Sequence, residues 1–249
     1  MSLLFFVRHG QASFNGDDYD QLSARGVEQS RQLGLHWTEL KLIFDHVYVG
    51  PRRRHHQSLD AVAAVYHERG LKWPEPIELP ELDEHSGQDV LSRSLPDLMQ
   101  RDPAIREMKE KLRKDSDTAQ RDYLRLFQKI TRMWVRSELS LPDLEAWHEF
   151  RARVNRGIEK MTGTGGSKKN VAAFTSGGPT AAAMGFALNL DDEKTLELSW
   201  IVRNAACTEF LFSASKRLAS PKSDGGGRFS LVTFNAVPHL TNRDLLTFI

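Results

Sequence analysis

Runs of apolar residues along the chain predict the strands of a sheet. The first is an unbroken run at residues 3–7, bounded by Gly10 and a polar segment, which fits a strand buried on both faces. Other runs predict strands at residues 45–49, 77–79, 171–174, 208–212 and 229–234. The last two flank the glycine-rich stretch 223–227, so we expect them to form a closing hairpin.

Helices with one apolar side are expected between these strands. Ser23 is a candidate N-cap for a helix that runs to Leu40, with an apolar side made of Val27, Leu33 and Leu35. A second helix follows Gly50-Pro51, and its apolar side consists of Leu59, Val62, Ala63 and Tyr66. An alanine-rich helix is predicted to begin at Pro179 and to run through Leu188.

Residues 92–162 are charged, and their pattern is largely helical. We expect them to form an insertion into the series of strands and helices described above. One apolar face in the insertion is formed by Leu124, Phe127, Ile130 and Trp134. Residues 13–21 are polar and predict a surface loop. The order of elements predicts an α/β fold, a three-layer sandwich around a mostly parallel sheet with a helical insertion and a C-terminal hairpin. We expect one domain over residues 1–249.

Composition narrows the classes of partner. The 249 residues include 34 Lys and Arg against 33 Asp and Glu, so a net charge of +1 favours neither nucleic acid nor an anionic membrane. No apolar run approaches the roughly 18 residues of a membrane span, and the chain enters its first strand without a charged leader. The single cysteine, Cys207, predicts a buried small side chain in a protein of the reducing cytoplasm. The oligomeric state is left open.

Candidate chemistry begins where the first strand ends. Arg8 and His9 follow the apolar run, at the strand end where ligands bind in open α/β sheets, and Gly10 permits a close turn. Arginine holds two phosphoryl oxygens at once, and a neutral imidazole nitrogen is a competent nucleophile toward phosphorus. Residues 52–54 are three arginines at a strand-to-helix junction, where backbone N–H groups favour an anion. The alternative for both motifs is a solvated surface.

These strand ends, taken together, resemble those of the histidine phosphatase superfamily, the phosphoglycerate-mutase-like proteins. The similar motifs fall in family order along most of the chain: Val-Arg-His-Gly-Gln at 7–11, Asn15, Leu22-Ser-x-x-Gly26 with Gln29 and Leu33-Gly34, Gly50-Pro51-x-x-Arg54-x-x-Gln57, Leu82-x-Glu84 with Gly87, and Gly177-Gly178. Residues 92–162 carry none of these motifs.

The resemblance implies a phosphatase or phosphomutase that works through a phosphohistidine. By position, His9 is the nucleophile, Arg8 and Arg54 hold the phosphoryl oxygens, and Glu84 is the general acid for the leaving alkoxide. Two guanidinium groups can neutralise the charge of a phosphoryl group without Mg²⁺, so we expect neither a metal nor another cofactor. Mutase activity additionally requires a tightly held phosphoenzyme and a sugar-acid pocket, which no pattern here indicates.

One departure from the family bears on catalysis. Family members usually place a second histidine after the late strand, and this chain has Ser176 there, followed by Gly177. A hydroxyl donates one hydrogen bond but carries no charge, and losing such a donor costs about 10² to 10³ in rate in known enzymes. Backbone N–H groups of Gly177 and Gly178 are candidates to bind phosphate in part compensation. Gln11 and Asn15 are further candidates to contact phosphate or substrate, with solvated loop residues as the alternative.

A histidine from elsewhere in the chain is a second way to compensate. His85, His55 and His56 are nearest to the candidate site in sequence, and each equally fits a surface or supporting position. His239 follows the last strand and is expected to be structural. Asn204 fits a turn position of the family, with an Asx turn as the alternative.

Two function classes follow from these patterns. The first is a metal-independent phosphomonoesterase that acts on small phosphate esters. The second is a module that binds phosphate esters or phosphoproteins and has lost turnover because of Ser176. The helical insertion is a candidate surface for interaction or dimerisation in either case.

Overall fold

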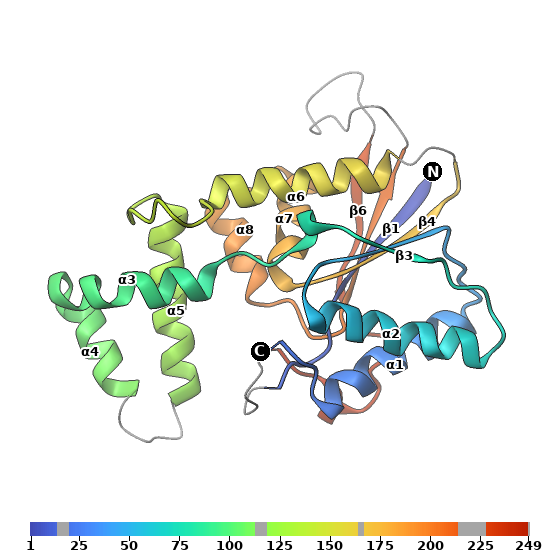
Figure 1. Ribbon diagram of the computed structural model, residues 1–249, viewed down its shortest axis with the longest axis horizontal. Helices are drawn as coiled ribbons and strands as arrows, with labels where there is room; N and C mark the ends of the chain where they lie inside the picture. Colours follow the sequence, from blue (N-terminus) through green and yellow to red (C-terminus); the bar gives the residue numbers. More distant parts are fainter. Residues whose placement is uncertain (14–19, 113–118, 164–166, 214–227, 249) are drawn as a thin grey trace. The chain divides into compact units, whose positions relative to one another are not determined.

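The computed structural model of the protein describes residues 1–13, 20–112, 119–163, 167–213 and 228–248 (Figure 1). Contacts group the chain into two compact units, one made of Met1–Glu84 with Ala152–Ile249 and the other of His85–Arg151. The sheet belongs to the first unit, and the second is helical. The prediction of one domain with an insertion at about 92–162 stays a prediction.

A mixed sheet forms the centre of the first unit, and it has six strands within the described ranges. The strand order is β3-β2-β4-β1-β5-β6, with β1 at Ser2–Arg8, β2 at His46–Val49, β3 at Pro76–Glu78, β4 at Asn170–Thr175, β5 at Cys207–Phe212 and β6 at Phe229–Ala236. The first four strands in this order run parallel, whereas β5 is antiparallel to β1 and β6 is antiparallel to β5. The α/β fold class is confirmed. The predicted turn at 223–227 lies outside the described residues.

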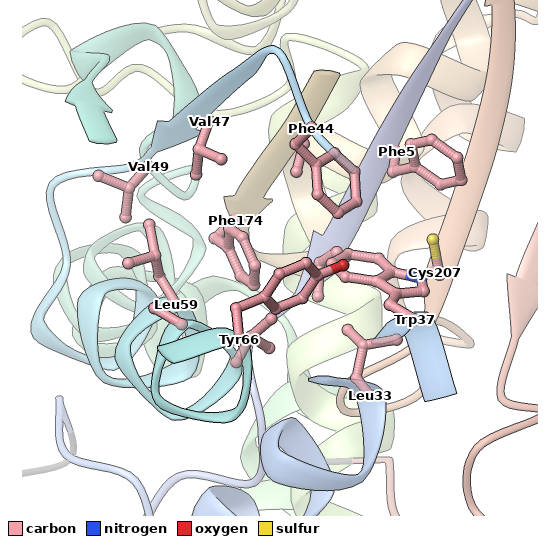
Figure 2. Packing of buried hydrophobic residues seen from close by; sticks show 14 residues of the cluster. Phe5, Leu33, Trp37, Phe44, Val47, Val49, Leu59, Tyr66, Phe174 and Cys207 are labelled. Carbon is pink, nitrogen blue, oxygen red and sulfur yellow. The ribbon is translucent and has the colours of Figure 1, made fainter. Parts of the chain in front are cut away.

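Side chains of β1 alternate between two apolar layers. Phe5 and Val7 point to the face covered by α1 (Ala24–Glu39) and α2 (Arg53–Glu68), where Trp37 and Tyr66 are buried with them (Figure 2). Phe5 meets the Trp37 ring edge-on, with 5.9 Å between ring centroids. The strand is therefore buried on both faces, as its unbroken apolar run predicts.

The other face of the sheet is covered by α7 (Gly177–Leu188), against which α8 (Asp192–Ser199) packs. Phe6 meets Phe210 of β5 with 5.8 Å between ring centroids, and Phe186 of α7 meets Phe229 of β6 with 5.7 Å. Helix α7 begins at Gly177, so the predicted start at Pro179 was wrong. Helix α8 has a low share of apolar residues and was not predicted.

The helix predicted after Ser23 is confirmed, with one error on its apolar side. The Ser23 side chain caps α1 by accepting a hydrogen bond from the Gly26 N–H at 3.1 Å. Leu33 is buried, but 45% of Val27 is exposed, because the residue lies on the outer side of α1. Short 3₁₀ helices lie at Pro80–Leu82 and Arg243–Leu245.

The second unit is helical, as residues 92–162 predict. It contains α3 (Gly87–Arg101), α4 (Pro103–Leu112), α5 (Ala119–Val135) and the start of α6 (Trp147–Thr162). Phe127, Ile130 and Trp134 are buried along α5, and Trp134 meets Trp147 with 5.5 Å between ring centroids. Within the described parts of the chain, no helix has the length and apolar character that a membrane crossing requires.

Candidate active site

Parallel pairing brings the carboxyl ends of three strands to one edge of the sheet. Arg8 at the end of β1 lies opposite Thr175 at the end of β4, and Val49 of β2 lies opposite Phe174. The backbone continues this arrangement, because the His9 N–H donates to the Thr175 carbonyl at 2.8 Å. The residues that follow the three strands therefore meet at one place.

His9 is buried at this edge, with 4% of its surface exposed. Its Nδ1 lies 2.7 Å from the carbonyl oxygen of Gly10. A carbonyl only accepts hydrogen bonds, so the proton of a neutral ring belongs on Nδ1, and Nε2 keeps its lone pair. The Arg54 Nε donates to this Nε2 at 3.1 Å. The ring thus presents an Nε2 lone pair toward the guanidinium of Arg54.

Electrostatics keep the His9 ring neutral. Burial lowers its pKa well below the usual value, and the positive charges of Arg54 and Arg8 lower the pKa further because they repel an imidazolium. A neutral ring is the form in which nitrogen attacks phosphorus.

Arg54 connects the strand ends. The residue is 6% exposed, and besides His9 its guanidinium reaches the Ser176 Oγ with Nη2 at 3.5 Å and the Asp20 Oδ1 with Nη1 at 2.8 Å. The other Asp20 oxygen accepts from the Arg53 N–H at 2.9 Å, at the start of α2. Asp20 was not predicted, because it stands in a polar segment that reads as a solvated loop.

Arg8 lies against the start of α7. Its guanidinium donates to the Val202 carbonyl through Nη1, and the residue is 7% exposed. A Cβ added to Gly177 would lie 3.7 Å from the Arg8 Nε and only 2.9 Å from the Ser199 carbonyl oxygen. Glycine at position 177 therefore lets the helix start lie against the Ser199 carbonyl, whereas the distance to Arg8 is an ordinary van der Waals contact.

Glu84 lies at the same helix start. Its Oε2 accepts from the Gly178 N–H at 3.2 Å, where a helix N-terminus favours negative charge. The preceding turn is fixed from two sides, since Thr175 donates to the Leu82 carbonyl at 2.6 Å and Arg153 donates to the Asp83 carbonyl at 3.1 Å. Arg153 was not predicted, because it belongs to a charged helix far along the chain.

Ser176 forms the N-cap of α7 and is fully buried. Its Oγ lies 2.7 Å from the Nε2 of His55, which is also fully buried. The structure thus brings one of the three candidate histidines to the serine. His56 is part-exposed and contacts Glu78 at 3.0 Å instead, and His85 lies among aromatic rings of the helical unit.

The remaining candidates that the structure describes contact neighbouring side chains. Gln11 accepts from the Ser23 hydroxyl at 3.1 Å through its Oε1, so its role toward substrate stays a prediction. Asn15 lies outside the described residues. Asn204 accepts from the Thr247 hydroxyl at 2.9 Å, and His239 is buried with its ring 6.3 Å from that of His36.

A sequence model of the Histidine phosphatase superfamily (branch 1) matches residues 4–121 and 93–220. The chain belongs to this superfamily. The matched ranges include every residue of the edge described above, from Arg8 to Ser176. A sequence comparison with curated proteins finds no match.

Solved structures of histidine phosphatases share the fold of the chain. Phosphoserine phosphatase of Entamoeba histolytica is 15% identical with a TM-score of 0.57, and the alignment covers 96% of this chain and all of that one. The mycobacterial glucosyl-3-phosphoglycerate phosphatase is 16% identical with a TM-score of 0.57, and 95% and 99% are covered. Phosphoglycerate mutase of Bacillus anthracis is 18% identical with a TM-score of 0.54, and 93% and 92% are covered.

Within the ranges that the structure describes, no group of three or more His, Cys, Asp or Glu residues is arranged to hold a metal ion. The charged groups at the strand ends include the guanidinium groups of Arg8 and Arg54 and the carboxylates of Asp20 and Glu84.

Proposed function

We propose that this histidine phosphatase is a phosphomonoesterase that transfers the phosphoryl group of a small phosphate ester to His9 and then to water. The observation that carries the proposal is the His9 ring, whose Nε2 lone pair faces the guanidinium of Arg54 at 3.1 Å. A phosphoryl oxygen bound by that guanidinium brings phosphorus to the nucleophile.

In the first step the Nε2 lone pair attacks phosphorus. The P–N bond forms while the bond to the ester oxygen breaks, and the leaving oxygen takes its electron pair and a proton from the Glu84 carboxyl group, whose protonated form is favoured by the negative charge of the bound ester. Arg8 and Arg54 balance the charge of the phosphoryl oxygens. The proton of His9 stays on Nδ1, which donates it in a hydrogen bond to the Gly10 carbonyl oxygen 2.7 Å away, and this bond stabilises the phosphorylated ring.

In the second step water replaces the histidine. The Glu84 carboxylate accepts a proton from the attacking water, the new P–O bond forms, and the P–N bond breaks. Nε2 regains its lone pair and phosphate leaves. The same carboxyl group therefore acts first as acid and then as base.

Small phosphorylated metabolites are the proposed substrates, and the names of two structural relatives, phosphoserine phosphatase and glucosyl-3-phosphoglycerate phosphatase, support this class. The proposed mechanism is independent of metal ions, since two buried guanidinium groups supply the positive charge. We place the enzyme in the cytoplasm, and the buried free thiol of Cys207 fits that reducing compartment.

The test compares hydrolysis of p-nitrophenyl phosphate in EDTA by the unmodified protein and by His9→Ala. We expect hydrolysis by the former and a loss on the order of 10³-fold or more in the latter. His67→Ala, on the exposed side of α2, is the matched control and should keep full activity. Equal rates with and without His9 would refute the proposal. A protein that phosphate stabilises against heat but that hydrolyses nothing would instead be a binding module.

A further inference from the structure

His55 is a buried titratable group that the proposed mechanism does not use. It follows Arg54 in the first turn of α2, and none of its surface is exposed. Its ring centroid lies 5.8 Å from that of His9, and its Nε2 lies 2.7 Å from the Ser176 Oγ. A second imidazole therefore reaches the proposed phosphoryl site through a hydroxyl.

The fold makes room for this ring. A Cβ added to Gly50 would lie 2.5 Å from the His55 Nδ1, so a side chain at position 50 would displace the imidazole. The Gly50 backbone lies close enough to the ring to form a hydrogen bond that opposes the fall in pKa caused by burial and Arg54.

Hydrogen-bond capacity at Ser176 indicates what the ring does. A hydroxyl has one proton to donate and two lone pairs that accept. Arg54 can only donate, and its Nη2 lies 3.5 Å from the Oγ. When the His55 Nε2 also carries a proton and donates, both lone pairs are occupied, and the Ser176 proton must be donated elsewhere. The acceptor within this site is then an oxygen of a bound phosphoryl group.

We propose that His55 is a positioning residue that turns the Ser176 hydroxyl into a hydrogen-bond donor for the transferring phosphoryl group. The proposal rests on the proposed phosphoryl site at His9. In the empty site His55 is neutral, since burial and the positive charge of Arg54 both lower its pKa. A bound dianion reverses the sign of the nearby charge and favours a proton on Nε2. His55 and Ser176 together thereby supply a hydrogen-bond donor that points at the phosphoryl group, a direction that the serine hydroxyl alone would not keep.

Kinetics of p-nitrophenyl phosphate hydrolysis test the coupling between the two residues. We expect kcat to fall at least tenfold in Ser176→Ala and in His55→Ala, and to fall no further when both changes are combined. His56→Ala, a part-exposed neighbour, is the matched control and should retain its kcat. If the loss of kcat in the double variant equals the product of the losses in the two single variants, the proposal is overturned.

Moving the imidazole provides a test of rescue. In the variant that combines His55→Ala with Ser176→His, the ring comes from the end of β4 instead of α2, and Arg54 remains beside it. We expect its kcat to exceed that of His55→Ala at least tenfold. A kcat no higher than that of the single variant would contradict the proposal, provided that thermal melting shows both variants folded.

A measurement without turnover separates this proposal from the proposed function. Nitrogen NMR of the histidine rings is recorded while inorganic phosphate is added to the unmodified protein and to His9→Ala, with His55→Ala used to assign the signals. We expect the His55 Nε2 signal to move to its protonated position as phosphate saturates the site, in both proteins. A His55 signal that stays unchanged at saturation would overturn the inference even if the enzyme hydrolyses phosphate esters. The expected signal change in a protein without turnover would uphold it while the phosphatase proposal fails.

Discussion

The carboxylate of Asp20 lies 2.8 Å from the guanidinium of Arg54, the same group that reaches the His9 Nε2 at 3.1 Å. The Asp20 side chain is about one-third exposed, whereas that of Arg54 is 7% exposed. A carboxylate therefore occupies part of the guanidinium that the proposed mechanism assigns to phosphate. In that mechanism phosphate competes with Asp20 for Arg54, and we expect this competition to lower the affinity for phosphate.

Removing the charge of Asp20 should tighten the binding of phosphate. We expect Asp20→Asn to lower the inhibition constant of inorganic phosphate about fivefold, which corresponds to about 1 kcal/mol of relieved repulsion. Competitive inhibition of p-nitrophenyl phosphate hydrolysis measures this constant. Asp60→Asn, on the exposed side of α2, controls for the change in net charge and should leave the constant unaltered. An unchanged constant in Asp20→Asn would show that the ion pair does not oppose phosphate.

The role of Glu84 as general acid predicts a dependence on the leaving group. A p-nitrophenolate leaves readily without a proton, whereas an alkoxide requires one. We expect Glu84→Gln to lower kcat/KM about 10²- to 10⁴-fold for an alkyl phosphate such as phosphoserine and far less for p-nitrophenyl phosphate. Parallel kinetics with the two substrates measure the difference. Equal losses for both would mean that Glu84 acts on binding or folding rather than on the leaving oxygen.

Much of this arrangement follows from local sequence patterns. The apolar run at 3–7 specifies a strand buried on both faces, and the parallel pairing of β1 with β4 then sets Arg8 opposite Thr175. The parallel pairing of β2 with β4 brings the residues that follow β2 to the same edge. His9 and Arg54, separated by 45 positions, meet at 3.1 Å for that reason.

Other contacts depend on tertiary structure that no local pattern encodes. His55 stands in a run of arginines and histidines that resembles a solvated surface, yet the direction of α2 turns its ring inward to Ser176. Arg153 comes from a charged helix and reaches the turn before Glu84 across 70 positions. Val27 shows the converse error, since an apolar residue in a helical pattern was assigned to the core and is exposed.

Buried histidines predict a loss of stability in acid. Burial, together with the charge of His36, lowers the pKa of His239 from 6.5 to about 4. His239 is therefore protonated below about pH 6.5 in the unfolded chain but only below about pH 4 in the folded chain. Stability falls as the pH drops through this range, because the unfolded chain binds more protons there. For His239 alone, the free energy of unfolding should decrease by about 2 kcal/mol between pH 7.5 and pH 5.

Urea denaturation of the unmodified protein and of His239→Gln at these two pH values isolates this contribution. The raised pKa of Glu209 opposes the trend in both proteins, so the difference between the two pH slopes belongs to the histidine. We expect the slope to be smaller in His239→Gln, whatever the absolute stability of that variant. Parallel slopes would contradict the assignment.

A close approach between two backbone segments beside the nucleophile predicts the largest effect on stability. A Cβ added to Gly10 would lie 2.2 Å from the Gly26 carbonyl oxygen, and a Cβ added to Gly26 would lie 2.2 Å from the Gln11 carbonyl oxygen. Because both contacts are with backbone, neither can be relieved by a change of rotamer. Gly10→Ala and Gly26→Ala should each lower the free energy of unfolding by about 3 kcal/mol, the upper range for an overpacked core.

The control is Gly70→Asn, since Gly70 has a φ of +66° with open space around it and asparagine tolerates that conformation. Urea denaturation should show a loss below about 1 kcal/mol in this control, and an equally small loss in Gly10→Ala would mean that the strand and the helix separate easily there.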